Sequence, residues 1–292
     1  MKVLNVGSLN IDHVYEVDHF VQPGETLLAN DYQRCLGGKG FNQSIALARA
    51  GAKVYHAGKI GEDGEVFLKA CAEEHINTEF ILKSNLPTGH AIIQIDSKGQ
   101  NSIILHGGAN QDIDESNIDS LLADCDKGDY LVVQNEVSGM ASIINTAKAR
   151  GMTIVFNPAP ITPEVKHYPL KEVDIFILNE IEAEQLSGHQ EPATALSSLQ
   201  GTYPQARIII TLGAEGVIYG DEQGAIQRVP AQKVKAVDTT AAGDTFVGYT
   251  VASLITGEDL NTAISRGVHA AAITVQSLGA SPSIPHQAEI CS

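Results

Sequence analysis

The residues best suited to chemistry lie in the segment Asp238-Thr-Thr-Ala-Ala-Gly-Asp-Thr-Phe246, which precedes a strongly apolar stretch typical of a buried helix. Small residues at 241–243 allow backbone N–H groups to converge at a helix start, where they can hold phosphate oxygens without a cationic side chain. Asp244 would lie in the first helical turn, where the ionised carboxylate is favoured. An anion site beside a carboxylate base is what phosphoryl transfer to a hydroxyl group requires. A glycine-containing turn capped by Asp and Thr is the simpler alternative.

Three further polar segments suit adjacent hydroxyl groups. Asn10 and Asp12 alternate after a predicted strand, so both side chains face one side and together offer donors and acceptors. In Gly37-Gly-Lys-Gly-Phe-Asn-Gln43, the glycines permit close backbone approach, and Lys39 and Asn42 are three apart on a helix, so both can face one ligand. Glu136 follows a predicted strand and fits a hydroxyl acceptor. An Asx-rich turn, a helix cap and a polar loop are the respective alternatives.

Two other segments could face a nucleotide. Asn179 and Glu182 are one turn apart at a predicted helix start, where they could hold waters around Mg²⁺ or simply form a capping box. Thr211-Leu-Gly-Ala-Glu-Gly216 is a glycine-flanked turn that could expose backbone groups, or an ordinary β-turn. The Ala-rich stretch 257–279 could leave a shallow apolar slot for adenine, and we expect its single histidine, His269, to be structural.

The composition limits the class of protein. The chain has 292 residues, a 43% hydrophobic content and 19 − 35 = −16 net charge, which fits one large globular domain and argues against nucleic-acid or acidic-membrane binding. The four cysteines (35, 71, 125 and 291) show no metal-like spacing, and we expect reduced thiols. The N-terminus lacks a signal-peptide pattern and no apolar run could span a bilayer, so we expect a soluble cytoplasmic protein.

The elements that must position these residues alternate between strands and helices. Apolar runs predict strands at Val3–Val6, Val54–Ile60, Tyr130–Gln134, Thr153–Asn157, Ile175–Leu178, Ile208–Thr211 and Val217–Tyr219. Helices are predicted at about 40–50, 64–75, 115–123, 138–150, 180–187, 193–200, 243–256 and 260–277. This order favours a buried, mostly parallel sheet flanked by helices on both faces. Residues 11–36 and 88–106 instead suggest hairpins in a small separate sheet that covers a cleft, or surface hairpins without a ligand role.

With these motifs in order, the chain resembles the ribokinase-like (phosphofructokinase-B) carbohydrate kinases, from Gly7-Ser-Leu-Asn-Ile-Asp12 to Gly279-Ala-Ser-Pro-Ser283. The resemblance implies one α/β domain, residues 1–292, with a small β-sheet lid formed by about 11–36 and 88–106. It also implies ATP-dependent phosphorylation of a sugar hydroxyl, with Mg²⁺ and an activating K⁺. Likeness to the family's ribose-phosphorylating members implies O5 of D-ribose as the acceptor, and a homodimer formed through the lid.

Residue roles follow from the same resemblance, motif by motif. The implied sugar ligands are Asn10, Asp12, Gly38, Lys39, Asn42, Glu136 and Asp244. Asp244 would be the catalytic base, with Ala241, Ala242 and Gly243 as the anion hole. Asn179, Thr211, Gly213 and Gly216 would bind the nucleotide, and Glu182 would hold Mg²⁺ through water. The implied K⁺ ligands are Asp238, Thr240, Ser277, Gly279 and Ser283.

Other functions remain open at this point. Another acceptor, such as 2-deoxyribose, fructose, a nucleoside or pseudouridine, would suit the same motifs. A catalytically silent sugar-binding protein on this fold is a different class, although the intact Asp244 and anion-hole residues argue against it. A nicotinamide-dependent dehydrogenase is disfavoured because no G-x-G-x-x-G follows the first strand.

Overall fold

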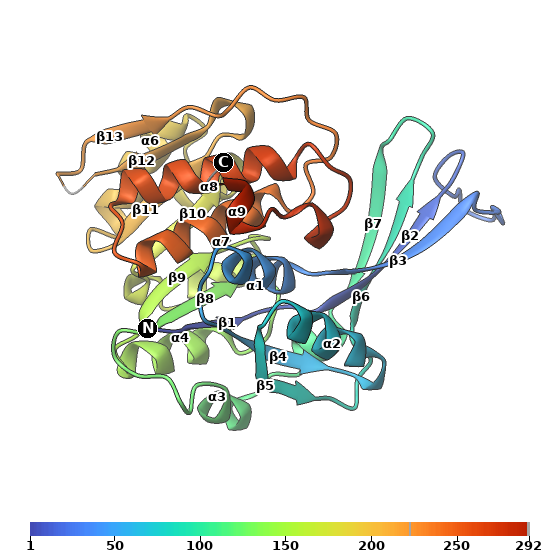
Figure 1. Ribbon diagram of the computed structural model, residues 1–292, viewed down its shortest axis with the longest axis horizontal. Coiled ribbons are helices and arrows are strands. Elements are labelled where there is room, and N and C mark those ends of the chain that lie inside the picture. The colour runs from blue at the N-terminus through green and yellow to red at the C-terminus, as the bar shows by residue number, and fades with distance from the viewer. Residues whose placement is uncertain (222, 291–292) are drawn as a thin grey trace.

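A computed structural model describes residues 1–221 and 223–290, and in these the chain forms two β-sheets with helices packed around the larger one (Figure 1). The larger sheet has nine strands in the order β13-β12-β11-β10-β9-β8-β1-β4-β5. Its strands are β1 (Val3–Val6), β4 (Val54–Ile60), β5 (Asn77–Lys83), β8 (Tyr130–Gln134), β9 (Thr153–Asn157), β10 (Ile175–Asn179), β11 (Arg207–Thr211), β12 (Val217–Gly220) and β13 (Ile226–Val229). All neighbouring pairs from β11 to β5 are parallel, and β12 and β13 add antiparallel edge strands.

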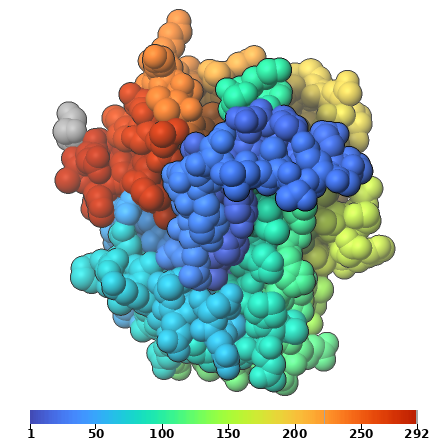
Figure 2. All heavy atoms as spheres, turned by 90° about the vertical axis from the view of Figure 1, so that its right-hand side faces the viewer, coloured from blue at the N-terminus to red at the C-terminus, as the bar shows by residue number. Residues whose placement is uncertain are grey.

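A smaller sheet projects from the body of the molecule, in the order β3-β2-β6-β7. It contains β2 (Asn10–Glu16), β3 (Asp31–Gly37), β6 (Gly89–Ile95) and β7 (Asn101–His106). Two antiparallel hairpins, β2–β3 and β6–β7, join through a parallel pairing of β2 with β6. Figure 2 faces this side of the molecule, and the blue N-terminal segment crosses its front. The prediction of a small separate sheet from residues 11–36 and 88–106 is confirmed.

Helices cover both faces of the large sheet because its strands are buried on both sides. The helices are α1 (Lys39–Arg49), α2 (Glu65–Glu73), α3 (Glu115–Leu121), α4 (Met140–Ala149), α5 (Glu180–Ser187), α6 (Pro192–Thr202), α7 (Ala242–Ile255), α8 (Leu260–Thr274) and α9 (Gln287–Ile290). Alternate residues along each strand point to opposite faces, so Val132 packs with one hydrophobic cluster and Leu131 with the other. The predicted α/β architecture is confirmed.

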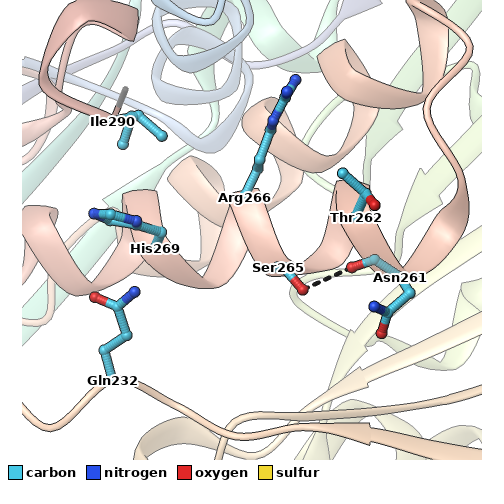
Figure 3. A pocket seen from close by; sticks show the side chains of 7 residues that line it. All are labelled: Gln232, Asn261, Thr262, Ser265, Arg266, His269 and Ile290. Carbon is cyan, nitrogen blue, oxygen red and sulfur yellow. Dashed lines mark hydrogen bonds between the residues drawn. The ribbon is translucent and has the colours of Figure 1, made fainter. Parts of the chain in front are cut away.

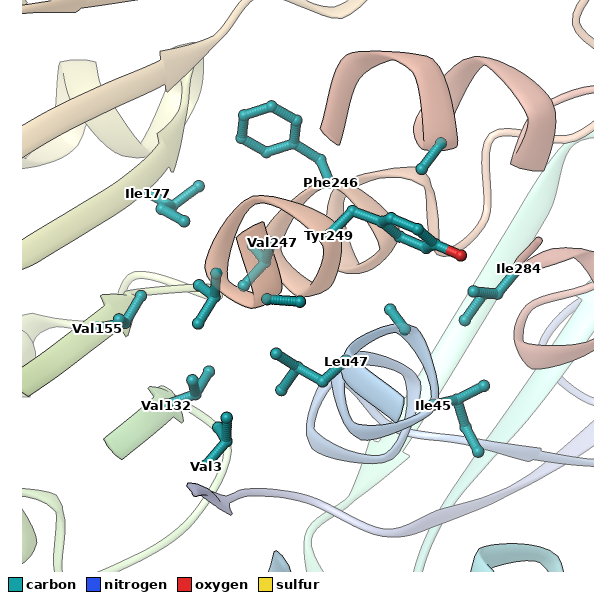
Figure 4. Close-up of a cluster of buried hydrophobic side chains, with 14 of the residues drawn as sticks. Val3, Ile45, Leu47, Val132, Val155, Ile177, Phe246, Val247, Tyr249 and Ile284 are labelled. Atoms are coloured by element: carbon teal, nitrogen blue, oxygen red, sulfur yellow. The ribbon is translucent and has the colours of Figure 1, made fainter. Parts of the chain in front are cut away.

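The cluster on the face covered by α1 and α7 is the one that supports the site. Val3, Val132, Val155 and Ile177 from four strands pack against side chains of these two helices (Figure 4). Helix α7 is almost wholly buried between the sheet, α1 and α8, as its apolar sequence predicts. The helix that begins beside Asp244 therefore has little freedom to move.

Some elements differ from the sequence predictions. Strands β5 and β13 were not predicted, because each lies at an edge of the large sheet and exposes polar side chains that interrupt the apolar pattern. The helix expected at 260–277 ends at Thr274, and Val275 begins a turn. No helix in the described part of the chain is long and apolar enough to cross a membrane. Three cysteines, 35, 71 and 125, are free thiols, and Cys291 lies outside the described residues.

Candidate active site

The candidate site lies where five parallel strands end. Strands β1, β8, β9, β10 and β11 run in the same direction, so their carboxyl ends share one edge of the sheet. Ligands of open α/β sheets bind at this edge. Helices α1 and α7 pack against each other and begin at the sugar-side and anion-hole motifs, respectively. This packing brings Asn42 within hydrogen-bond distance of Asp244, although the two residues lie far apart in the sequence.

Asp244 is buried in the first turn of α7, and both of its carboxylate oxygens accept side-chain hydrogen bonds from α1. Gln43 Nε2 donates to Oδ1 at 3.0 Å, and Asn42 Nδ2 donates to Oδ2 at 3.2 Å. Within residues 1–221 and 223–290, Asn42 Oδ1 is a buried acceptor without a hydrogen-bond partner, so a ligand hydroxyl could donate to it. A carboxylate held on two sides can act as a base toward a group that approaches from a third.

The turn before α7 is strained in a way that suits an anion site. Ala241 has φ 61° and ψ 5°, a left-handed conformation that non-glycine residues adopt at a cost of about 1–2 kcal/mol. A left-handed residue followed by a helix start directs successive N–H groups toward the same point. Ala242 is half-buried and Gly243 is exposed, so the start of the helix is open to a ligand.

The Gly38–Gly40 loop packs directly against the end of β1. Gly38 has φ 96°, and a Cβ on Gly40 would lie only 2.4 Å from the carbonyl carbon of Gly7 and from Ser8 N. Ser8 also accepts from Phe41 N at 3.0 Å through its carbonyl oxygen. Glycine is needed here because any larger residue would separate α1 from β1.

Lys39 interacts electrostatically with three carboxylates, those of Asp244, Glu136 and Glu182. The pKa of Lys39 is raised, mainly by Asp244 and further by Glu136 and Glu182, although burial opposes the shift. Burial raises the pKa of Glu136, while Lys39 and hydrogen bonds from Ser8 Oγ and Lys39 N (3.1 Å) act in the opposite direction. Burial likewise raises the pKa of Glu182. A region with three carboxylates and one ammonium group attracts hydroxyl donors and cations.

The small sheet contributes Asn10 and Asp12. Asn10 is buried, and its Oδ1 accepts from Asn110 Nδ2 at 2.7 Å. Asp12 has a pKa raised to about 6, first by burial and then by the negative charge of Glu136. A Cβ on Gly37 would lie 2.1 Å from Asp12 Oδ2, so the glycine makes room for this carboxylate. A cavity of about 200 Å³ is lined by Asn10, Asn110 and Glu136, together with Leu105 from β7.

The predicted nucleotide residues lie at neighbouring strand ends. Asn179 and Glu182 form a reciprocal capping box at the start of α5: Glu182 N donates to Asn179 Oδ1 at 2.8 Å, and Asn179 N donates to Glu182 Oε2 at 2.9 Å. Asn179 Nδ2 also donates to Glu182 Oε1 at 2.9 Å. Thr211 ends β11 and its hydroxyl donates to Leu178 O at 3.3 Å. Gly213 begins a short 3-10 helix, η5 (Gly213–Glu215), which Gly216 follows with φ 103°. The capping interpretation of Asn179 and Glu182 is thus confirmed.

Three of the five predicted K⁺ ligands meet around one carboxylate. Asp238 Oδ1 accepts from Thr240 N at 2.9 Å and from Thr240 Oγ1 at 2.6 Å, and Oδ2 accepts from Gly279 N at 2.9 Å. Ser277 lies in the exposed turn after α8. Ser283 is buried in the 3-10 helix η6 (Ser281–Ser283), and its hydroxyl donates to Ala280 O at 2.8 Å. No cluster of three or more His, Cys, Asp or Glu side chains suited to a metal ion is found in the described ranges.

A larger cavity, of about 600 Å³, lies on the outer side of α8 (Figure 3). Asn261, Thr262, Ser265, Arg266 and His269 from α8 line it with Gln232 and Ile290. Most of its lining residues are polar in type, but apolar atoms form most of its lining surface, and His269 faces this cavity.

Sequence reasoning missed several residues that complete the site. Gln43 was quoted as the end of a motif but given no role, and it holds Asp244 directly. Asn110, in the 3-10 helix η2 (Gly108–Gln111), holds Asn10. Ser8 joins Glu136 to the Gly38–Gly40 loop. The residue types of Gln43, Asn110 and Ser8 do not by themselves indicate a role in the site, because their interactions join residues up to about 200 positions apart.

Comparisons with known proteins show the family to which the chain belongs. The model of the family described as "pfkB family carbohydrate kinase" matches residues 1–287. The ribokinase of Haemophilus influenzae is 40% identical, over 99% of this chain and 97% of its own length.

Two solved structures show the same fold over 99% of this chain. The ribokinase of Cryptococcus neoformans var. grubii in complex with ADP has a TM-score of 0.86 at 34% identity, over 98% of that chain. The Arabidopsis thaliana ribokinase complexed with ribose and ATP has a TM-score of 0.88 at 26% identity, over 97% of that chain. The protein described here is therefore a member of the pfkB family of carbohydrate kinases.

Proposed function

We propose that this protein is an ATP-dependent kinase that transfers the γ-phosphoryl group to O5 of D-ribose, giving ribose 5-phosphate and ADP. The observation that carries the proposal is a buried carboxylate, Asp244, held at a helix start beside Lys39 and Glu136. Full-length relatives at up to 40% identity are ribokinases, and one structural neighbour is a complex with ribose and ATP. ATP and a sugar are cytoplasmic metabolites, so we propose that the protein acts there.

Ribose would lie between the small sheet and the starts of α1 and α7. Asn10, Asp12 and Glu136 offer acceptors and a donor from one side, and Lys39 and Asn42 face it from the other, with the Gly38 backbone close by. A sugar alcohol donates well to carboxylates and accepts from an ammonium group or amide. The pattern of polar groups therefore suits a ligand with several adjacent hydroxyls.

Asp244 accepts the proton of the attacking hydroxyl. In a loose transition state the nucleophile is weakly bonded and loses its proton late, so placement of the base matters more than its strength. The N–H groups of Ala241, Ala242 and Gly243 stabilise charge on the transferring phosphoryl oxygens, at about 3–4 kcal/mol per donor by analogy with oxyanion holes. Gly213, Gly216 and Thr211, with Asn179, bind the rest of the nucleotide.

Two cations fit the donor groups near this site. Glu182 would hold Mg²⁺ through one of its waters, since Mg²⁺ keeps several waters in nucleotide sites, and the ion would supply positive charge to the phosphates. Burial of the Glu182 carboxyl raises its pKa, which is a cost that a nearby cation would relieve. A K⁺ ion would take oxygen ligands from Asp238, Thr240, Ser277, Gly279 and Ser283. The Asp238 carboxylate already gathers Thr240 and Gly279, which supports this set.

The small sheet would serve as a lid on a single catalytic domain spanning residues 1–292. Its residues 11–36 and 88–106 carry Asp12 and Leu105 to the sugar side, so closure would exclude water and suppress hydrolysis of ATP. Exposed apolar side chains on β6 and β7, among them Ile92, Ile103 and Ile104, favour a homodimer formed through the lids.

An ADP-release assay over a panel of acceptors tests the proposal. D-Ribose, 2-deoxyribose, fructose, a nucleoside and pseudouridine should be compared at equal concentration, with and without K⁺. We expect ribose to give the highest kcat/KM, with formation of ribose 5-phosphate and a higher rate in K⁺. A higher kcat/KM with another acceptor would reassign the substrate, and no ADP release with any acceptor would favour a silent sugar-binding protein.

A further inference from the structure

A fully buried chain of side-chain amides lies behind Asp244. Gln43 Nε2 donates to Asp244 Oδ1 at 3.0 Å and to Asn157 Oδ1 at 3.1 Å. Gln134 Nε2 donates to Gln43 Oε1 at 2.7 Å and to Asn5 Oδ1 at 2.9 Å. These amides come from α1 and from the strands β1, β8 and β9. All four lie within the protein, with Gln43, Gln134 and Asn5 completely inaccessible to solvent.

The two ends of the chain are tied to the main chain. Asn5 Nδ2 donates to Gly40 O at 2.7 Å, and Asn157 Nδ2 donates to Ile177 O at 2.9 Å. Each end amide must therefore present its oxygen to the next member. A flipped Gln43 would place its oxygen against two acceptor oxygens and its NH₂ against the NH₂ of Gln134, which low-dielectric surroundings make costly. The hydrogen-bonding direction of Gln43 is thus fixed from both sides.

We propose that Gln43 is a positioning residue for the catalytic base, and that the Asn5–Gln134–Gln43–Asn157 amide chain fixes the Asp244 carboxylate on the sheet. This inference rests on the proposed function, because it assumes that Asp244 takes the proton. Asn42 also donates to Asp244, but its Oδ1 has no hydrogen-bond partner in the described ranges, so it is a sugar-ligand candidate itself. Gln43 is completely buried, and its Nε2 and Oε1 both bond within the protein.

A buried donor of this kind has two effects on the base. Nε2 holds Oδ1, so that the position of Oδ2 toward the sugar is defined. It also opposes rotation of the carboxylate, because rotation would break this bond and leave the buried Nε2–H group without an acceptor. A displacement of a reacting group by about 1 Å can cost about 10²-fold in rate. The amide chain should therefore affect turnover rather than sugar affinity.

The test is Gln43→Met, which keeps the length and approximate volume of the side chain and removes both polar groups of the amide, the NH₂ and the C=O. We expect kcat to fall at least tenfold, with the Kd for ribose measured by calorimetry changing less than threefold. A folded Gln43→Met enzyme with kcat within twofold of wild type would overturn the inference. A ribose Kd that weakens as much as kcat falls would also overturn it, because the residue would then act through sugar binding.

Ile45→Val provides the control for general loosening of α1. Ile45 lies two residues further along the same helix and is also buried, but it packs in the hydrophobic cluster and has no polar group that could bond to the amide chain or to Asp244. The variant should lose thermal stability through the loss of one buried methyl group while keeping kcat within threefold. If it loses turnover as Gln43→Met does, general loosening of α1 explains both, and the inference fails.

The pH profile gives a readout that a purely structural role would not change. In Gln43→Glu a second carboxyl group would face Asp244 Oδ1, and two carboxyls so close share a proton. In the profile of kcat against pH, the midpoint of the acid limb should therefore move to a pH at least one unit higher. This variant also tests the inference if Gln43→Met does not fold. An unmoved limb would contradict the inference. The variant Asp244→Asn separates the two proposals. If Asp244→Asn keeps normal turnover, Asp244 is not the base and the proposed function of this residue is wrong. If Asp244→Asn is inactive while Gln43→Met has normal turnover, only the proposed role of Gln43 is wrong.

Discussion

Ribose affinity should fall as the pH drops through about 6, because the proposed sugar ligand Asp12 would accept the hydroxyl groups in its ionised form. The pKa of Asp12 is raised to about 6 by burial and by the charge of Glu136. A sugar hydroxyl donates to a carboxylate, so a protonated Asp12 must lose its proton before it can accept two hydroxyls. Above the pKa of Asp12 the carboxyl is already ionised, so binding needs no deprotonation. Below this pKa the free-energy cost of deprotonation grows with each pH unit.

The size of the effect follows from the ionised fraction, which is about 0.9 at pH 7 and about 0.09 at pH 5 for a group of this pKa. The apparent Kd for ribose should therefore be about tenfold higher at pH 5 than at pH 7, and nearly constant between pH 7 and pH 8. Binding at pH 5 should release close to one proton per sugar. An unshifted aspartate, with a pKa near 3.9, would change affinity by less than about 10% over the same range.

Isothermal titration calorimetry at pH 5 to 8, in pairs of buffers with different ionisation heats, measures both the Kd and the proton release. In Asp12→Asn the affinity should be lower and the change between pH 5 and pH 7 should disappear. In Glu136→Gln the midpoint should move below 6, since one cause of the raised pKa is removed. A Kd that is flat from pH 5 to pH 7 in the wild type, with no proton released, would refute the reasoning.

Three further substitutions test the site and its support. Asp244→Asn should keep ribose binding and lose at least about 10²-fold in kcat, as measured by ADP release; near-normal turnover would remove Asp244 from the base role. Gly40→Ala should destabilise the protein by about 1–3 kcal/mol in urea unfolding, because its Cβ would meet the Gly7 and Ser8 backbone at 2.4 Å; an unchanged midpoint would contradict that geometry. Thr250→Val should raise the free energy of unfolding by about 1 kcal/mol, since within the described ranges the buried Thr250 hydroxyl has no hydrogen-bond partner; a loss of stability would show that this hydroxyl is satisfied.

The sequence predicted the parts of the fold that local patterns determine. Apolar runs marked the strands β1, β4 and β8 to β12 of the large sheet, because a strand covered on both faces has little room for polar residues. The edge strands β5 and β13 escaped detection since their outer faces are exposed. The order in which strands pair has no local signature, so the alternation of strands and helices predicted a mostly parallel sheet but not the strand order.

The site shows the same division. Asp244 could be recognised because its neighbours form a distinctive segment at a helix start, and Asp12 because it alternates with Asn10 after a strand. Gln43 could not, since its role depends on Asp244, Asn157 and Gln134, which come from three other elements. A glutamine in a helix is chemically unremarkable until the packing of α1 on α7 shows what it faces. Supporting residues are therefore the part of a site that sequence motifs describe least.

The charge of the site places a condition on how ATP can enter. Lys39 lies among Asp244, Glu136 and Glu182, and its raised pKa means that its charge is already engaged by these carboxylates. The terminal phosphate would meet a region of net negative charge if side chains alone decided the potential. In the proposed site, the backbone N–H groups at 241–243 and the cations that accompany the nucleotide would supply positive potential. The left-handed conformation of Ala241 would then serve to direct these N–H groups toward the phosphate. Binding of ATP should accordingly depend far more on Mg²⁺ than ribose binding does, and equal dependence of both would argue against an anion site made of main-chain amides.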